Sequence, residues 1–443
     1  MSAPPPRRVY FRTFGCQMNE YDTGKMRAQL VADGFVETSE PEEADVILLN
    51  TCSIREKAVD KMRSALGDYR AMKRNGKQVT IGIAGCVAQQ EGQRLLDQYR
   101  ELDLVFGPDG VPHVRELVSR AIQNRQPVLD TDFLDLENYP FVSDIDPADH
   151  GVGAFVTIQK GCDNKCTFCI VPSTRGVEIS RPHTEILDEV RAFVDRGVQE
   201  ITLIGQNVNS YGLKRTGELT FAQLLRAVAA VPGVRRIRYT TSHPRDMGDD
   251  VIEAHRDLEV LAPMLHLPVQ SGSNAVLRRM KRFYKREHYL EIVRKLREAR
   301  PDLLLTTDII VGFPGETDED FELTMSLLEE VGFVGSYSFK FSARPGTPAL
   351  RLKDPVDPEV AQARLLRWQN RQRALSLQWM KSLEGTVQNV LVEGPSRHDE
   401  GVVCGRTGTS AMINFPGDTA LVGQWVDVRV TRGFTHSARG ERI

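Results

Sequence analysis

The sequence predicts an α/β protein with three folded parts: an N-terminal open parallel α/β sheet, a central partial (β/α)6 barrel and a small C-terminal β-barrel. Three observations predict this class. Strand-like and helix-like segments alternate along most of the chain, which is typical of parallel sheets with crossover helices. An acidic segment interrupts the alternation once, and residues 383–443 contain short strands but no long helix. With 443 residues, the chain is long enough for several domains of ordinary size.

The composition limits the class of protein and the surfaces that it offers. Hydrophobic residues make up 41% and charged residues 26%, so a disordered, collagen-like or coiled-coil architecture is excluded for most of the chain. Lys and Arg total 57 against 60 Asp and Glu, so any nucleic-acid surface must be local. No apolar run approaches the ~20 residues of a membrane span, and no secretory signal is evident. We therefore expect a cytoplasmic protein without a membrane partner.

The N-terminal domain is expected over residues 7–125. Its strands are predicted at 9–14, 45–50, 79–84 and 103–106, and its helices at 19–32, 54–73, 89–99 and 111–122. The second strand contains the apolar run Val-Ile-Leu-Leu, which is typical of a strand buried on both faces. The four repeats predict a parallel sheet with helices on its faces.

Three cysteines follow the first three of these strands directly. They are Cys16, Cys52 and Cys86. The carboxyl ends of parallel strands meet at one edge of a sheet, so we expect these thiols to converge there. In a cytoplasmic chain with seven cysteines, this pattern indicates metal or redox chemistry rather than disulfides. The alternative for each is a small buried apolar residue, but three repeats of the pattern favour a shared site.

An acidic linker is expected over residues 126–150. From 127 to 150 the sequence has seven acidic residues, three prolines and no Lys or Arg. Such a composition predicts an extended strap between domains. The central domain would then run from 151 to 382.

A second cysteine triplet, Cys162, Cys166 and Cys169, has the spacing C-x3-C-x2-C directly after a predicted strand at 154–160. A zinc site would need a fourth ligand, and His183 is a poor candidate because it follows Pro182 at an expected helix start. Three close thiolates instead suit three irons of a [4Fe–4S] cluster, with the fourth iron left open.

The central domain continues with five further strand–helix repeats. Strands are predicted at 200–204, 236–240, 264–269, 304–311 and 336–341, and helices at 185–195, 221–231, 247–255, 286–299 and 317–331. With the strand at 154–160 this makes six β/α units, too few for a closed eight-unit barrel. Polar and glycine residues follow the strands at 205–207, 241–243, 270–272 and 312–315, where they serve either as turns and caps or as ligand contacts.

The C-x3-C-x2-C segment resembles that of the radical S-adenosylmethionine (SAM) superfamily, and the N-terminal triplet resembles that of its methylthiotransferases. The match extends to the branch that forms 2-methylthio-N6-dimethylallyladenosine in tRNA, and it covers the chain from about Val9 to Gly440. The phrases that carry it are FGCQMNEYD from Phe14, TCSIREKA from Thr51, GCDN from Gly161, CTFCIVP from Cys166, TRG from Thr174, SRP from Ser180, VEGPS from Val392 and NFPG from Asn414. Ser173 departs from the tyrosine that this family usually has.

The resemblance implies two [4Fe–4S] clusters, one on each cysteine triplet, and SAM as the second cofactor. Gly205, Gln206 and Asn207 would meet the methionyl amino group, although the commoner form of this segment is Gly-Gly-Glu. The residues implied to hold the ribose and adenine of SAM are Gln270, Ser271, Ile310, Val311, Gly312 and Phe341.

The resemblance also implies the reaction: a methylthio group replaces C2–H of N6-dimethylallyladenosine at tRNA position 37, next to the anticodon. That C–H bond offers no acidic proton and no leaving group, so acid–base side chains cannot perform the exchange. Reductive cleavage of SAM at the second cluster would supply a 5′-deoxyadenosyl radical, and the first cluster would hold the sulfur. The partners implied are the tRNA anticodon loop, an electron donor protein such as a flavodoxin or ferredoxin, and a sulfur donor.

The C-terminal domain, expected over 383–443, resembles the TRAM-like β-barrel that binds RNA in many tRNA-modifying enzymes. Strands are predicted at 386–392, 401–404, 411–415 and 425–430, and Cys404 is expected to be a buried core thiol. Two basic segments, 278–286 and 360–381, are either solvated helix faces or RNA contacts.

Functions of two other kinds remain open from the sequence. Sister branches of the family methylthiolate threonylcarbamoyl adenosine or an aspartate of a ribosomal protein. From a different class, the chain could be a non-catalytic RNA-binding protein with structural zinc. Cys52-Ser-Ile-Arg-Glu and Asn414-Phe-Pro-Gly417 favour the dimethylallyl branch.

Overall fold

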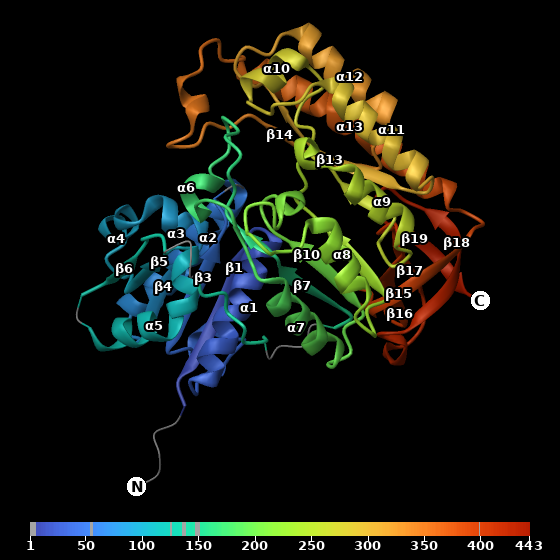
Figure 1. Ribbon diagram of the computed structural model, residues 1–443. Helices are drawn as coiled ribbons and strands as arrows, with labels where there is room; N and C mark the ends of the chain where they lie inside the picture. Colours follow the sequence, from blue (N-terminus) through green and yellow to red (C-terminus); the bar gives the residue numbers. More distant parts are fainter. Residues whose placement is uncertain (1–5, 54–55, 125, 135–138, 147–150, 398) are drawn as a thin grey trace. The chain divides into compact units, whose positions relative to one another are not determined.

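The computed structural model describes residues 6–53, 56–124, 126–134, 139–146, 151–397 and 399–443. These residues form two compact units (Figure 1). The first contains the described residues up to 146 together with 160–164 and 170–181, and the second contains 151–159, 165–169 and 182–443. Within the described ranges, no helix is both long and apolar enough to cross a membrane.

The first unit is built on a six-stranded parallel sheet with the order β2-β1-β3-β4-β5-β6. The strands are β1 (Arg8–Phe14), β2 (Val36–Glu37), β3 (Val46–Thr51), β4 (Thr80–Ala84), β5 (Leu104–Phe106) and β6 (Val128–Asp130). Every residue of β3 is buried, as the apolar run in its sequence predicts. The predicted parallel sheet is confirmed, but the two short strands β2 and β6 were not predicted.

Helices cover both faces of this sheet. α1 (Gln17–Ala32) and α5 (Val114–Gln123) pack against one face, and α2 (Glu56–Arg74), α3 (Cys86–Glu91) and α4 (Gln93–Gln98) pack against the other. Alternate residues of β3 enter the two cores: Val46 and Leu48 contact one set of helices, and Ile47 and Leu49 the other. The helix predicted at 89–99 is instead two short helices that meet at Gly92, whose positive φ ends the first.

The described part of the acidic segment 126–150 contacts the rest of the first unit. Its first residues form β6, which pairs with β5. Further along, Asp146 forms an ion pair with Arg27 of α1 at 2.5 Å, and Lys25 donates to the backbone oxygen of Asp144 at 2.7 Å. Three of the seven acidic residues, Asp135, Glu137 and Asp149, lie outside the described residues. At least one acidic side chain of the predicted strap, that of Asp146, is therefore an ion-pair partner of α1.

Two three-stranded parallel sheets form the centre of the second unit. One has the order β11-β10-β7 and the other the order β12-β13-β14, and a single parallel bridge from Ile237 to Leu261 links their neighbouring edges. The strands are β7 (Gly153–Thr157), β10 (Glu200–Ile204), β11 (Arg236–Tyr239), β12 (Met264–His266), β13 (Leu304–Val311) and β14 (Gly335–Lys340). The six parallel strands confirm a partial rather than a closed barrel.

Five long helices alternate with these strands: α7 (His183–Val194), α8 (Phe221–Ala229), α9 (Asp249–Asp257), α11 (Arg286–Ala299) and α12 (Asp318–Val331). Shorter elements carry the connections: β8 (Gln159–Lys160), α6 (Val171–Arg175), β9 (Ile179–Ser180) and α10 (Asn274–Arg279). α12 begins with a reciprocal capping box between Thr317 and Asp320 and ends at Gly332 in the left-handed conformation. His183 is the first residue of α7, as its position after Pro182 predicts.

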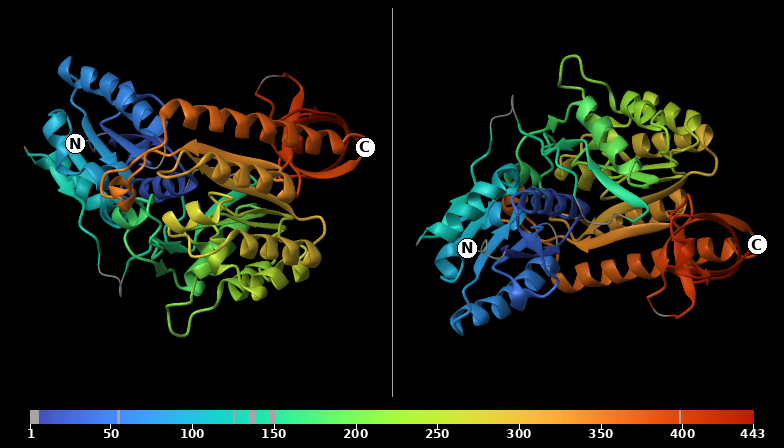
Figure 2. Two further views of the ribbon diagram at one scale, coloured as in Figure 1. Left: turned by 90° about the horizontal axis from the view of Figure 1, so that it is seen from above. Right: turned by 90° about the horizontal axis from the view of Figure 1, so that it is seen from below.

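A closed five-stranded barrel ends the second unit, and the long helix α13 (Pro358–Ser382) leads into it (Figure 2). The strands are β15 (Val387–Pro395), β16 (Val402–Arg406), β17 (Met412–Pro416), β18 (Trp425–Gly433) and β19 (Ala438–Arg442), in the order β15-β16-β17-β19-β18. The barrel is confirmed, although β19 was not predicted. Met380 at the end of α13 belongs to the barrel core.

The expectation for Cys404 is wrong, because its side chain is only partly buried. On β16 the inward positions are Val403 and Gly405, so the alternation of the strand turns Cys404 to the opposite face.

Candidate active site

The structure brings the first cysteine triplet to one edge of the first unit's sheet. Cys16 caps α1 after β1, Cys52 follows β3, and Cys86 begins α3 after β4, and these three strands are neighbours in the sheet. Gly15 permits their approach: with φ at +136°, a Cβ atom there would lie 2.3 Å from the Cβ atom of Cys52. Cys52 and Cys86 are buried, and Cys16 is partly buried.

Arg175 places a buried positive charge beside these thiols. It forms an ion pair with Asp22 at 2.7 Å, within the first unit. A hydrogen bond with Cys52 and the charge of Arg175 together lower the pKa of Cys16 to about 6, against the opposing effect of burial. Burial raises the pKa of Cys86, and Arg175 opposes that rise. The thiolate is the form that binds metal, so this charge favours ligand formation. In the sequence analysis, Arg175 appears only within the TRG segment that resembles the family, with no role of its own.

We expect Arg175→Met to destabilise the first unit by about 3–5 kcal/mol, because the variant leaves the Asp22 carboxylate buried without its partner. Urea denaturation followed by circular dichroism measures the loss. The matched control is Arg191→Met, since the ion pair of Arg191 with Asp188 is solvent-exposed on α7 and its removal should leave the unfolding midpoint unchanged. Equal effects of the two variants would contradict a structural role for the buried pair.

The second triplet lies on a loop that both units share. Cys162 belongs to the first unit, where its N–H donates to the oxygen of Gly176 at 3.2 Å. Cys166 and Cys169 belong to the second unit, where the N–H of Cys169 donates to the oxygen of Cys166 at 3.1 Å. Between them, Thr167 donates through its N–H to the oxygen of Met280. The second unit therefore holds its two thiols in a turn anchored to the end of α10.

Arg282 differs from the rest of the basic segment 278–286, because it is buried whereas Arg278, Arg279, Lys281 and Lys285 are exposed. Its side chain is buried and donates to Cys166 Sγ at 3.4 Å, to Pro268 O at 2.9 Å and to Tyr284 Oη at 3.1 Å. Tyr284 is also buried, and its hydroxyl donates to Val269 O at 2.8 Å. Buried and exposed residues alternate from Met280 to Lys285, which turns Arg282 and Tyr284 inward.

The residues predicted to contact SAM lie at strand carboxyl ends of the second unit. Ile310 and Phe341 pack around Phe313 together with Phe168, which lies between Cys166 and Cys169. Gln270, with φ at +72°, extends the pairing of β12: its N–H donates to Asp308 O, and its oxygen accepts from the N–H of Ile310. Val311 is buried and faces the opposite side of β13 from Ile310, as the alternation of a strand requires.

Gly205, Gln206 and Asn207 follow β10 on the other sheet. Asn207 is 2% exposed, and its Nδ2 donates to Asp246 Oδ2 at 2.7 Å. Gln206 is partly buried. Gln206 and Asn207 replace the second glycine and the glutamate of the commoner Gly-Gly-Glu form. Of these two, Asn207 is held in place by the Asp246 carboxylate.

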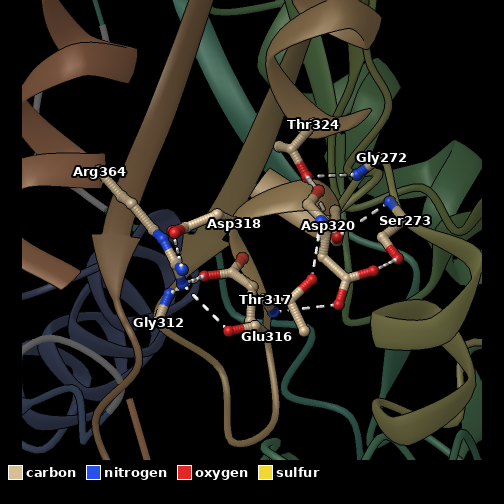
Figure 3. A network of polar contacts seen from close by, with 10 residues as sticks. Gly272, Ser273, Gly312, Glu316, Thr317, Asp318, Asp320, Thr324 and Arg364 are labelled. Atoms are coloured by element: carbon tan, nitrogen blue, oxygen red, sulfur yellow. Dashed lines mark hydrogen bonds and ion pairs between the residues drawn. The ribbon is translucent and has the colours of Figure 1, made fainter. Parts of the chain in front are cut away.

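A polar network supports the loops after β12 and β13 (Figure 3). The N–H of Gly312 donates to Glu316 Oε2 at 2.6 Å, and Arg364 binds the same oxygen at 2.8 Å. Ser271 is fully buried, with its hydroxyl 3.3 Å from that of Thr324 on α12. Gly312 and Ser271 thus shape the strand ends through backbone and packing contacts.

Three of the five basic residues in segment 360–381 pair with acidic residues before and on α12. Arg364 binds Glu316 and Asp318, Arg367 binds Glu322, and Arg371 binds Glu329. These three arginines are engaged within the second unit.

We expect Arg364→Met to lower the stability of the second unit by about 2–3 kcal/mol, since it leaves Glu316 buried beside the Gly312 loop. Arg367→Met is the matched control, because both partners of its ion pair are exposed and its loss should not measurably shift thermal unfolding. Differential scanning calorimetry compares the two variants. An equal shift of the unfolding temperature in both variants would show that the buried ion pair stabilises the unit no more than the exposed one.

A cavity of about 740 Å³ lies between β14, α13 and the barrel. Its lining includes Tyr337, Phe339, Arg373 and His436, and the two aromatic side chains are exposed. Elsewhere in the unit, Trp425 of the barrel faces Arg235 and Arg236, whose guanidinium carbons are 4.6 and 4.4 Å from its ring centroid.

Models of three known families match the chain. The radical SAM superfamily matches residues 156–328, the uncharacterized protein family UPF0004 matches residues 8–107, and the TRAM domain matches residues 381–443. A tRNA-2-methylthio-N(6)-dimethylallyladenosine synthase from Methylococcus capsulatus is 48% identical over 441 residues, covering 99% of this chain and 96% of that protein. Another synthase with the same name, from Stenotrophomonas maltophilia, is 47% identical, and the match covers 98% of this chain and 93% of that protein. The chain belongs to the tRNA-2-methylthio-N(6)-dimethylallyladenosine synthase family.

Solved structures support the fold of this synthase. The radical SAM methyltransferase TsrM from Kitasatospora setae, with tryptophan and a SAM analogue bound, matches with a TM-score of 0.58 at 13% identity and covers 87% of this chain and 78% of that one. Another structure of TsrM contains cobalamin and a [4Fe–4S] cluster and gives a TM-score of 0.56. At this identity, the likeness concerns the fold alone.

The synthase uses SAM and [4Fe–4S] cofactors as a radical SAM enzyme, and the residues of the first unit fit such a group. Thr51 and Ser53 flank Cys52, and their buried hydroxyls have no hydrogen-bond partner among the described residues. Within that same part of the chain, no three His, Cys, Asp or Glu side chains are close enough to share a single metal ion. A cluster instead takes each thiolate on a different iron, and hydroxyls beside it can donate to its sulfurs.

Proposed function

We propose that this synthase replaces C2–H of N6-dimethylallyladenosine at position 37 of tRNA with a methylthio group. The observation that carries the proposal is the full-length relationship, at 48% identity, to a synthase of that name. The six cysteines at two strand-end sites support it, because they match the two-cluster pattern of the family. When bound, the clusters and SAM supply the radical and sulfur chemistry that no side chain can perform.

We assign the cluster ligands as Cys16, Cys52 and Cys86 for one site and Cys162, Cys166 and Cys169 for the other. Arg175 and Arg282 each bring a buried positive charge to one site, which stabilises the anionic thiolates. Gly205 to Asn207, Gln270, Ser271, Ile310 to Gly312 and Phe341 would orient SAM from the strand ends. The aromatic packing of Phe168, Phe313 and Phe341 supports this assignment, because it gives an adenine an apolar surface beside the cysteine loop.

The proposed domains are 7–125, 126–150, 151–382 and 383–443, with the last of these binding RNA. The exposed rings of Tyr337 and Phe339 beside Arg373 in the 740 Å³ cavity support RNA contact near the barrel, since bases stack on such rings. The tRNA anticodon loop is the proposed substrate because its unpaired bases can be extruded. A flavodoxin or ferredoxin as electron donor, a sulfur donor and a cytoplasmic location complete the proposal.

Nucleoside mass spectrometry of tRNA from cells that lack the gene tests the function. We expect 2-methylthio-N6-dimethylallyladenosine to disappear and N6-dimethylallyladenosine to accumulate, with restoration by the wild-type gene. Unchanged 2-methylthio product would refute the proposal. Loss of methylthio from threonylcarbamoyl adenosine instead would assign the chain to a sister reaction.

A further inference from the structure

Four buried side chains of the second unit end in polar atoms without hydrogen-bond partners among the described residues. The atoms are Gln159 Oε1 and Nε2, Asn207 Oδ1, Ser242 Oγ and His243 Nε2. The side chains are between 0 and 5% exposed. A buried polar atom without a partner costs free energy, so such a concentration indicates a site completed by a ligand.

These side chains gather at the carboxyl ends of the neighbouring strands β7, β10 and β11. Gln159 lies against Gly205: a Cβ atom on that glycine would be 2.6 Å from Gln159 Cγ. The loops after β10 and β11 are tied together, because Thr241 Oγ1 donates to Gly205 O at 2.6 Å and the N–H of His243 donates to Asn209 Oδ1 at 3.1 Å. Thr241 has φ at +65°, a strained conformation that often marks functional sites.

His243 presents a donor to this site. Burial, with Arg282 and Arg245 nearby, lowers the pKa of His243 to about 2, so the ring is neutral. Its Nδ1 accepts the N–H of Arg245 at 3.2 Å, which leaves the proton on Nε2. The ring also packs edge-on against Tyr284, at 5.7 Å between centroids, and Tyr284 contacts the Arg282 that binds Cys166. The site is therefore linked by direct contacts to the cysteine loop.

The chemistry of these atoms favours a neutral heterocycle over an ion. A carboxamide, a hydroxyl and a neutral imidazole offer both donors and acceptors but no formal charge. The carboxamide of Gln159 places an acceptor beside a donor, which matches N6–H and N7 of an adenine. The reaction occurs at C2, between N1 and N3, so an enzyme must hold the base by another edge. With the dimethylallyl group turned toward N1, the remaining N6–H stands beside N7.

Building on the proposed function, we propose that Gln159 determines specificity by pairing with the N6–H/N7 edge of the target adenosine, while Ser242 and His243 give neutral hydrogen bonds to the same nucleoside. The carboxamide oxygen accepts from N6–H, and the amide nitrogen donates to N7. This arrangement leaves C2 free, and it excludes N6,N6-dialkylated adenosine and guanosine, neither of which offers a donor beside N7.

The test is a cycle of variants and substrates with the reconstituted holoenzyme. Wild type, Gln159→Ala and Gln159→Glu are each given an anticodon stem–loop RNA with N6-dimethylallyladenosine or its 7-deaza analogue. For wild type, we expect kcat/KM to fall about 10- to 100-fold with the analogue, since the buried amide donor loses its acceptor. Gln159→Ala should lose a similar factor on the parent RNA and then show no more than about twofold further loss on the analogue.

Gln159→Glu keeps the shape of the side chain and the acceptor for N6–H but lacks the donor to N7. Its kcat/KM should therefore also be the same for the parent RNA and the 7-deaza analogue. This variant tests the proposed pairing if the alanine variant does not fold. His243→Phe should weaken binding of the parent RNA about tenfold while keeping the discrimination against the analogue. Gln93→Ala, an exposed position on α4, is the control and should match wild type.

SAM affinity, measured by equilibrium dialysis, should be unchanged in every Gln159 variant. Discrimination against the analogue that persists in both Gln159 variants would overturn the inference, as would a loss of SAM affinity without loss of RNA affinity, which would place SAM rather than RNA against this residue. If wild type forms no methylthio product on the parent RNA, the proposed function itself fails. The two failures are thus distinguishable.

Discussion

Cys166→Ala should abolish formation of 5′-deoxyadenosine from SAM and lower the iron content from about eight to about four per chain. Two remaining thiolates cannot hold the cluster with its open iron correctly presented, so the loss should be complete rather than partial. The contact of Arg282 with Cys166 strengthens this expectation, because the variant also leaves a buried guanidinium without its sulfur partner. The measurements are chemical iron analysis and chromatography of the dithionite-reduced enzyme with SAM.

The chain provides its own control in Cys404→Ala. Cys404 is the seventh cysteine and lies on a barrel strand, where its Sγ donates to Pro395 O at 3.8 Å. This variant should keep its iron and form 5′-deoxyadenosine at the wild-type rate. Normal 5′-deoxyadenosine formation by Cys166→Ala would refute the assignment of the second triplet.

Strand positions in this protein could be predicted because periodicity is a local property of the chain. Strand β13 and helix α11 have the bounds expected from sequence, and the three N-terminal cysteines meet at one edge because parallel strands must end there. The two-residue strand β2 and the three-residue strand β6 were missed, since such short segments carry no period.

Partners that are distant in sequence could not be predicted. Arg175 meets Asp22 across 153 positions, and Arg282 meets Cys166 across 116. From sequence alone, an arginine among other basic residues indicates a solvated face. Only tertiary packing reveals that Arg282 turns inward while its neighbour Phe283 stays exposed. The same holds for Gln159, whose amide shows its lack of partners only once the surrounding strands are placed.

Replacement of Cys16, Cys52 and Cys86 together by alanine should separate the two chemistries. We expect about four irons per chain, continued reductive cleavage of SAM, and no methylthio product on tRNA that contains dimethylallyladenosine. The physical reason is that, in the proposed assignment, radical initiation depends on the second triplet and sulfur attachment on the first. Iron, 5′-deoxyadenosine and the methylthio nucleoside are measured on the same sample.

One part of the structure could couple SAM cleavage to the first triplet in the triple variant. Residues 160–164, which include Cys162, and residues 170–181, which follow Cys169, pack with the first unit, and Arg175 is held there by Asp22. Alanine is small and apolar, so it should leave that packing and the Arg175–Asp22 pair intact where a larger or charged replacement would not. Retained methylthiolation would show that the first triplet is structural. Loss of both activities in a variant with wild-type circular dichroism would show that the first unit also shapes the loop of Cys162, so that the two cysteine sites work as one.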